Sequence, residues 1–233
     1  PTGEPGLVAL FNRDEQRDRA VAEPPSLREH AGGRRWIYPL DPDGGGTWLA
    51  AGERGIVVGL VNFYHAANFP DPPEGSSRSR GRLVRALLDF PDIDVMARHM
   101  DRLALHPYRP FHLFLFDSSG TGYRWRWDGQ AALKAPLSDP PWFLSTSSWN
   151  AEAVMARRES EFRALARKYR SGAGAPAESD LLDYHFSRGA EPGPATVRMR
   201  REDAHTVSVS RISIDRRRVE YSYWPTHANT PGS

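Results

Sequence analysis

The sequence contains no cysteine, and this absence excludes a small secreted fold held together by disulfide bonds. It also lacks any run approaching the roughly 20 apolar residues that a membrane-spanning helix requires, so no membrane span is expected. Its opening stretch, Pro1 to Gly6, has the character of a polar turn rather than of a signal peptide. A cytoplasmic location is therefore the default expectation.

An excess of charge of one sign is also missing. The 31 basic and 29 acidic residues give a formal net charge of +2, so no strong field is available to attract nucleic acid or an anionic membrane. We therefore expect no nucleic-acid partner. The hydrophobic share of 39% is enough for a sizeable core, and no boundary divides the chain, which predicts one domain over residues 1–233.

Alternation and helical spacing of apolar residues predict the order of the elements. Strand patterns occur at residues 7–11, 35–38, 47–50, 56–63, 112–117, 123–128, 205–214 and 218–224, with a further strand end at 143–145. Helical patterns follow Ser77 or Ser79, follow Asp92, span 151–169 and include Leu181, Leu182 and Phe186. The rest of 24–43 and residues 64–77 are expected to be loop. Because strands and helices do not alternate regularly, the predicted class is α+β.

The most unusual polar group is Asn12-Arg13-Asp14-Glu15, which directly follows the apolar strand at 7–11. At the end of a buried strand, such side chains can point into a cleft, where an Asp beside an Arg keeps its charge and orients an amine. The alternative interpretation is a polar turn whose surface ion pairs contribute little stability. The spacing alone favours neither.

A second polar residue, Asn62, ends the apolar strand at 56–63. Its amide can donate a hydrogen bond to an oxyanion that forms during a reaction. The alternative, which is favoured when this residue is taken alone, is an Asn that ends the strand by bonding to neighbouring backbone.

Several other motifs are given structural interpretations. Gly44-Gly45-Gly46 lacks the Lys and the following helix of a phosphate-binding loop, so nucleotide binding by this loop is excluded. The alternation in Arg124-Trp125-Arg126-Trp127 predicts two tryptophans in the core and two solvated arginines rather than a platform for single-stranded nucleic acid. The scattered histidines lack the spacing of zinc ligands, so no metal site is expected.

Four strings occur together in the order of one known family, the NRDE or transport and Golgi organisation 2 family. They are Phe11-Asn12-Arg13-Asp14-Glu15, Gly45-Gly46-Thr47-Trp48-Leu49, Leu60-Val61-Asn62-Phe63 and Ser79-Arg80-Gly81-Arg82-Leu83-Val84. Leu144-Ser145-Thr146 and Asp203-Ala204-His205-Thr206-Val207-Ser208 resemble its later landmarks. The resemblance extends from about Leu7 to about Tyr223 and implies an αββα sandwich like that of the N-terminal-nucleophile hydrolases.

In those hydrolases an N-terminal Cys attacks a carbonyl and its own α-amine acts as the base. The resemblance implies that Asn12 and Asp14 correspond to the Asn-x-Asp pattern of the choloylglycine-hydrolase branch, with Asp14 orienting the amine. It also implies that Asn62 binds the oxyanion, that Thr146 completes the oxyanion hole, and that Arg13 meets an anionic group of the substrate. Because the sequence has no Cys, we expect the natural protein to begin about seven residues before Pro1, with Met-Cys and a strand.

Two functions follow from the resemblance. The first is hydrolysis or transfer of an acyl group from a C–N amide bond of a small molecule, without a cofactor. The second is a carrier of haem or lipid, in which Trp48, Phe63, Tyr64 and Trp149 line an apolar pocket and His65 is an axial ligand. The enzyme requires a free N-terminal Cys, whereas the carrier requires only a pocket for its hydrophobic ligand.

Overall fold

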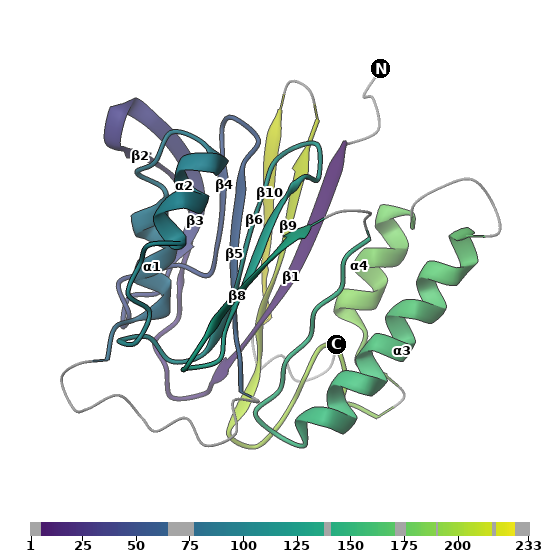
Figure 1. Ribbon diagram of the computed structural model, residues 1–233. Helices are drawn as coiled ribbons and strands as arrows, with labels where there is room; N and C mark the ends of the chain where they lie inside the picture. Colours follow the sequence, from purple (N-terminus) through teal and green to yellow (C-terminus); the bar gives the residue numbers. More distant parts are fainter. Residues whose placement is uncertain are drawn as a thin grey trace. The chain divides into compact units, whose positions relative to one another are not determined.

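The computed structural model describes residues 6–64, 77–137, 141–170, 176–189, 191–215 and 218–226, except for the side chains of residues 168 and 170. Within these ranges the chain forms ten strands in two antiparallel sheets, together with four α-helices (Figure 1), so the predicted α+β class is confirmed. The contacts group into two compact units, which are described separately. Unit 1 comprises residues 1–7, 20–139 and 213–221, and unit 2 comprises residues 8–19, 140–212 and 222–233.

Unit 1 contains a seven-stranded sheet in which each strand pairs with the next along the chain. The strands are β2 (Glu23–His30), β3 (Arg34–Leu40), β4 (Leu49–Gly52), β5 (Val57–Asn62), β6 (Phe111–Phe116), β7 (Gly122–Trp127) and β8 (Ala132–Leu137). A tight turn joins β4 to β5: the Gly52 amide donates to the Ile56 carbonyl at 2.8 Å, and Gly55 has a φ of 77°. β8 has no counterpart among the predicted strands, because its first residues are exposed and lack an apolar alternation.

The short strand predicted at 35–38 is confirmed as part of β3, whereas the loop predicted for residues 24–34 is wrong, because β2 pairs with β3 in a hairpin there. Pro24 and Pro25 suggested a break in structure, yet β2 lies at the edge of the sheet, where a missing backbone N–H is tolerated. The chain reverses through Gly32 and Gly33, whose φ values of 71° and 73° suit glycine.

Helices α1 (Arg80–Leu87) and α2 (Ile93–Met100) lie together on one face of this sheet (Figure 1). As predicted, Asp92 caps α2, its carboxylate accepting a bond from the Val95 amide at 2.8 Å. The helices bury their apolar side chains against β5, β6 and β7, and the core includes Leu83, Val84, Leu87, Met96, Met100 and both tryptophans of β7. The interpretation of Trp125 and Trp127 as core residues is therefore confirmed.

Unit 2 contains most of the sheet β1-β9-β10, which is formed by β1 (Leu7–Gln16), β9 (Ala204–Ile214) and β10 (Val219–Pro225). It also contains α3 (Ala151–Arg170) and α4 (Glu178–Phe186), as the helical spacing predicted. These two helices run side by side, with the rings of Phe162 and Tyr184 packed edge to face at 5.8 Å. The strand end expected at 143–145 is wrong, because these residues have no regular structure.

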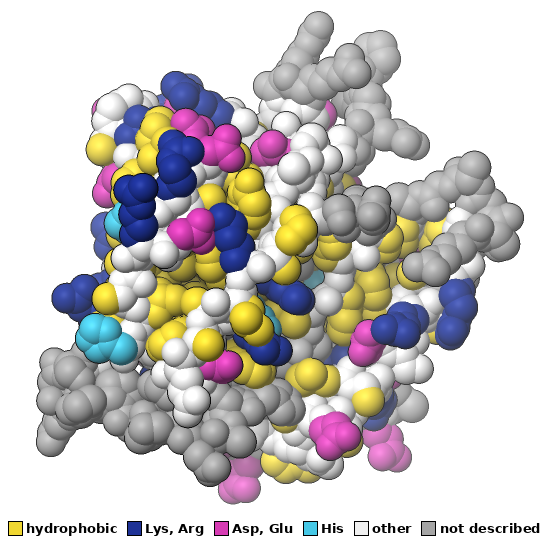
Figure 2. All heavy atoms as spheres, viewed as in Figure 1, with side chains coloured by type: hydrophobic (Ala, Val, Ile, Leu, Met, Phe, Trp, Pro, Cys, Tyr) yellow, Lys and Arg dark blue, Asp and Glu magenta, His cyan; other side chains and the backbone are white. Residues whose placement is uncertain are grey.

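On the face drawn in Figure 2, basic and acidic side chains are interspersed, as the small net charge leads one to expect. None of the described helices combines the length and the apolar character needed to cross a membrane.

Candidate active site

The Asn12–Glu15 motif lies inside a strand. The prediction that the strand ends at Phe11 and that the motif forms a polar corner is wrong, because β1 continues to Gln16. Since successive side chains in a strand point to opposite faces, Asn12 and Asp14 share one face and Arg13 and Glu15 share the other. The pleat therefore divides the motif into two pairs with different surroundings.

Asp14 is held by partners from two other segments of unit 2. Its Oδ1 accepts a hydrogen bond from the Thr206 hydroxyl of β9 at 2.6 Å. Its Oδ2 lies 3.8 Å from a terminal nitrogen of Arg158 on α3. The side chain keeps 28% of its surface exposed.

Burial raises the pKa of Asp14 above its usual value of 3.8. The positive charges of Arg158 and Arg201 and the hydrogen bond from Thr206 oppose this shift, and the charge of Glu15 adds to it. Desolvation outweighs the attraction of the two guanidinium groups. A further positive charge beside the carboxylate would oppose the shift in the same direction as Arg158 and Arg201 do.

Arg158 is the principal residue of the site that the sequence analysis missed. It is only 6% exposed, and its Nε and one terminal nitrogen donate to the Thr196 carbonyl at 3.1 and 2.7 Å. Its other terminal nitrogen donates to the Ser145 hydroxyl at 3.2 Å. The sequence does indicate that Arg158 is buried, because it falls at helical spacing between the apolar Val154 and Phe162, on the face of α3 that packs inward.

Asn12 connects β1 to the end of α4. Its amide nitrogen donates to the carbonyls of His185 and Val197 at 2.9 and 3.1 Å, and its oxygen lies 2.8 Å from Nδ1 of His185. Since the amide oxygen can only accept, Nδ1 of His185 carries the proton. Desolvation lowers the pKa of His185 to about 4, so the ring stays neutral. These bonds use both N–H donors of Asn12, which gives this residue a positioning role.

On the opposite face of β1, Arg13 pairs with Glu15. A terminal nitrogen of Arg13 lies 3.1 Å from the Glu15 carboxylate, and Nε of Arg19 lies 3.7 Å from the same oxygen. Arg13 is 8% exposed. Its role in binding an anionic substrate group remains a prediction.

Thr146 lies in the irregular segment that precedes α3. Its carbonyl accepts a hydrogen bond from Arg158 at 3.5 Å, so the structure brings Thr146 and Asp14 to the same guanidinium group. The predicted contribution of Thr146 to an oxyanion hole is not tested by this contact.

The remaining predicted residues belong to unit 1, apart from Trp149. The Asn62 amide, at the end of β5, donates to the Tyr64 hydroxyl at 2.9 Å, and the Phe63 ring packs against His112 with 4.8 Å between the centroids. Trp48 is 8% exposed, whereas Tyr64 and Trp149 are 48% and 45% exposed. These placements do not test the oxyanion role of Asn62 or the apolar pocket, and His65 lies outside the described residues.

Within the described parts of the chain, no group of three His, Asp or Glu side chains could hold a metal ion.

Comparison with known protein families shows to which family the chain belongs. Residues 4–218 match the family described as Transport and Golgi organisation 2. The chain belongs to this family. The resemblance inferred from the sequence motifs is therefore confirmed over nearly the whole chain. No curated protein matches the sequence.

Among solved structures, the chain is similar to penicillin V acylase from Agrobacterium tumefaciens. The similarity has a TM-score of 0.51 at 16% sequence identity and covers 96% of this chain and 80% of the acylase. At this identity the comparison shows the fold alone. The Transport and Golgi organisation 2 chain thus has the N-terminal-nucleophile hydrolase-like fold that was predicted.

Two strings typical of the Transport and Golgi organisation 2 family meet in unit 1. The amide of Thr47 donates to the Gly81 carbonyl at 3.1 Å, so the segment from Gly45 to Leu49 lies against the start of α1. A Cβ atom added to Gly46 would lie 2.2 Å from the carbonyl carbon of Gly81. This close approach of two backbones explains why the strings carry glycine at both positions.

Proposed function

We propose that this protein hydrolyses, or transfers the acyl group of, a C–N amide bond of a small molecule, with an N-terminal cysteine as the nucleophile. The observation that supports this proposal is the environment of Asp14. The carboxylate lies on a strand of an N-terminal-nucleophile hydrolase-like fold, is fixed by Thr206, and remains partly exposed. Because the printed sequence has no cysteine, the proposal requires one in residues that precede Pro1.

The reaction begins with the α-amine of that cysteine accepting the thiol proton. An α-amine titrates near neutral pH, which suits it to act as a base. The sulfur attacks the amide carbonyl, and a C–S bond forms as the carbonyl oxygen becomes an oxyanion. Asp14 binds the resulting ammonium group and holds it beside the sulfur. In this scheme the thiol is the nucleophile, the α-amine is its base and Asp14 orients the base, as in other enzymes whose nucleophile is activated by an adjacent base.

The tetrahedral intermediate then breaks its C–N bond. The ammonium group returns its proton to the leaving nitrogen, so the products of this step are a free amine and a thioester. Water attacks the thioester with the same amine as base, which releases the carboxylic acid and restores the thiol. In acyl transfer, a second amine takes the place of water.

Four further residues have proposed roles. Asn62 donates its amide N–H to the oxyanion, and the segment at Thr146 supplies a second donor. Removal of one such donor costs about a hundredfold or more in kcat in enzymes of this kind. Arg13 binds an anionic group of the substrate, and Asn12 positions β1 against α4 through the bonds described above.

The test uses the natural-length protein with a panel of amides that includes penicillin V, and it measures release of the amine. We expect Asp14→Asn to lower kcat about a hundredfold, because the neutral amide no longer stabilises the ammonium group. The matched control is Asp18→Asn, since Asp18 is exposed on the same segment of the chain. Equal turnover by the wild type and a folded Asp14→Asn variant would contradict the proposal.

A further inference from the structure

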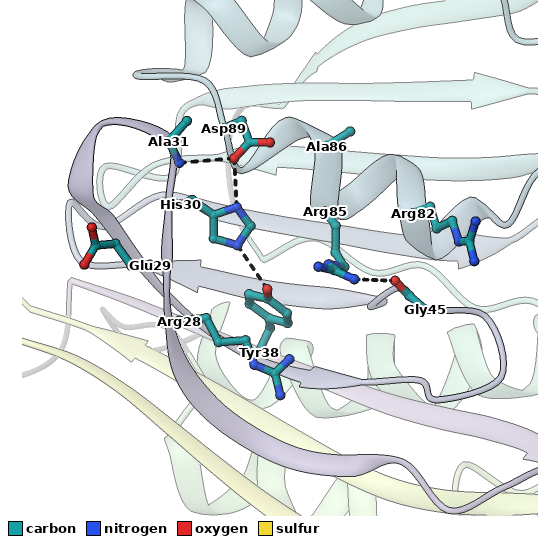
Figure 3. Close-up of a pocket in the computed structure, with 10 residues that line it drawn as sticks. All are labelled: Arg28, Glu29, His30, Ala31, Tyr38, Gly45, Arg82, Arg85, Ala86 and Asp89. Carbon is teal, nitrogen blue, oxygen red and sulfur yellow. Dashed lines mark hydrogen bonds and ion pairs between the residues drawn. The ribbon is translucent and has the colours of Figure 1, made fainter.

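A cavity in unit 1 combines positive charge with hydrogen-bond donors that the protein does not use. It has a volume of about 740 Å³ and is lined by residues of β2, β3 and α1 and of the turn at Gly45 (Figure 3). This volume lies within the range of small-molecule binding sites. The cavity is separate in sequence and in chemistry from the residues around Asp14.

Two arginines of α1, Arg82 and Arg85, provide the charge. Nε of Arg82 donates to the Gly44 carbonyl at 2.9 Å, and a terminal nitrogen of Arg85 donates to the Gly45 carbonyl at 2.6 Å. Among the described residues, neither side chain forms an ion pair with a carboxylate. Each guanidinium group carries a positive charge and retains further N–H donors.

The orientation of these arginines is partly fixed. Residues at this spacing lie on one side of a helix, and both side chains are tied to neighbouring carbonyls of a single turn. Binding a ligand therefore costs less side-chain entropy than it would for freely rotating arginines. Fixed guanidinium groups with spare donors are well suited to bind the oxygens of a phosphate group.

The part of the cavity wall formed by His30, Tyr38 and Asp89 offers no free ring nitrogen to a ligand. Nδ1 of His30 lies 3.0 Å from the Asp89 carboxylate, and Nε2 lies 3.0 Å from the hydroxyl of the buried Tyr38. The same Asp89 oxygen accepts a hydrogen bond from the Ala31 amide at 3.3 Å. This chain of bonds is visible in Figure 3. Both ring nitrogens of His30 are therefore occupied, and the wall is a fixed surface rather than a source of donors.

The third arginine of the cavity is already neutralised. A terminal nitrogen of Arg28 lies 2.9 Å from the Glu23 carboxylate, and its guanidinium carbon lies 4.9 Å from the centre of the Tyr38 ring. The acidic residues Glu29 and Asp89 also line the cavity, and they disfavour an anion near β2. The anion is therefore expected at the end formed by Gly45, Arg82 and Arg85.

We propose that this cavity binds a small molecule through a phosphate group held by Arg82 and Arg85. The glycine turn itself does not act as a phosphate-binding loop, because it holds the arginines through its carbonyl oxygens. The site would bind its ligand whether or not the protein hydrolyses amides.

Ala86 offers a sharp test, because its side chain is exposed, lines the cavity and takes part in none of these bonds. Ala86→Glu places a carboxylate beside the two arginines, and Ala86→Gln adds a side chain of nearly equal size without charge. Ala153→Glu, at an exposed position of α3, makes the same change in net charge at another helix. Titration calorimetry at low ionic strength measures binding of inorganic phosphate and of phenyl phosphate, with phenol as the uncharged probe.

We expect saturable binding of phosphate or phenyl phosphate, but not of phenol, by the wild type, Ala86→Gln and Ala153→Glu. Ala86→Glu should weaken binding about tenfold or more. Tighter binding of phenyl phosphate identifies a phosphorylated molecule as the ligand, whereas equal affinities identify free phosphate. Absence of binding by the wild type, or equal affinities of folded Ala86→Glu and Ala86→Gln, would overturn the proposal. Should Ala86→Glu fail to fold, Arg85→Gln provides the same comparison, and its unchanged affinity would overturn the proposal equally.

Discussion

The guanidinium group of Arg158, on α3, lies 3.8 Å from the carboxylate of Asp14, on β1, and donates its closest hydrogen bonds to the Thr196 carbonyl. Arg158 therefore does two things at once. It fixes the segment around Thr196 to α3, and it places a positive charge beside the carboxylate that we propose as the ammonium-binding group.

Replacing Arg158 with Met should destabilise the protein by on the order of 3 kcal/mol, because a buried carbonyl loses its donors and Asp14 loses a nearby positive charge. Arg157→Met is the matched control. Arg157 is exposed and pairs with Glu161 along the helix, an arrangement worth no more than about 0.5 kcal/mol. Chemical denaturation of both variants measures the difference. Similar losses in the two variants would show that Arg158 is not a structural anchor.

Asp14→Asn should change stability in a way that depends on pH. The pKa of Asp14 is higher in the folded protein than in the unfolded chain, so the folded protein binds this proton more tightly. Protonation of Asp14 therefore stabilises the fold fully at low pH, and this stabilisation is lost as pH rises through the folded pKa. The variant should therefore gain stability relative to the wild type on going from pH 3 to pH 7. Denaturation curves at the two pH values test this. A relative loss on going to pH 7 would mean that the charges of Arg158 and Arg201 outweigh desolvation.

His185 should make the protein less stable in acid. Its pKa falls from 6.5 to about 4 on folding, so stability is present above pH 6.5 and is lost as pH falls from 6.5 towards 4. We expect His185→Gln to reduce this loss by on the order of 2 kcal/mol. The slope of unfolding free energy against pH is the measurement, and His106→Gln, at an exposed position, is the control. An unchanged slope in His185→Gln would show that the ring is already protonated in the folded state or solvated.

Gly46→Ala should destabilise the protein by roughly 3 kcal/mol, because its Cβ would meet the backbone of Gly81 and neither segment can move freely. Gly59→Ala, in β5 of the same unit, is a suitable control, since its Cβ would meet only a Leu49 methyl group at an ordinary 3.5 Å. Thermal unfolding should therefore show a large decrease in Tm for the first variant and a small change for the second. Equal melting temperatures would contradict the close approach of the two strings.

The sequence allowed most of the fold to be predicted wherever apolar spacing was clear. The helices α1, α2, α3 and α4 and the hairpins β4–β5 and β6–β7 follow from that spacing. The sequence predicted the strand of β3 but not β2, because Pro24 and Pro25 indicate a local break, whereas the edge position that tolerates them depends on the whole sheet.

The candidate site was predicted only in part, for a similar reason. Asn12 and Asp14 stood out as polar residues after an apolar run, but their partners lie far along the chain. Thr206 and His185, which contact Asp14 and Asn12, lie more than 170 positions further along the chain. The spacing of residues in the sequence carries no information on such contacts. Arg158 could have been found, because a charged residue on the apolar face of a helix requires a partner.

The proposed N-terminal cysteine nucleophile can be tested by intact mass spectrometry of the natural-length protein after treatment with an activated phenylacetyl ester. We expect one acyl group, located by peptide mapping on an N-terminal cysteine, absent from the Cys→Ala variant and formed more slowly by Asp14→Asn. A mature chain without an N-terminal cysteine, or acylation that is equally rapid in the wild type, Cys→Ala and Asp14→Asn proteins, would contradict it.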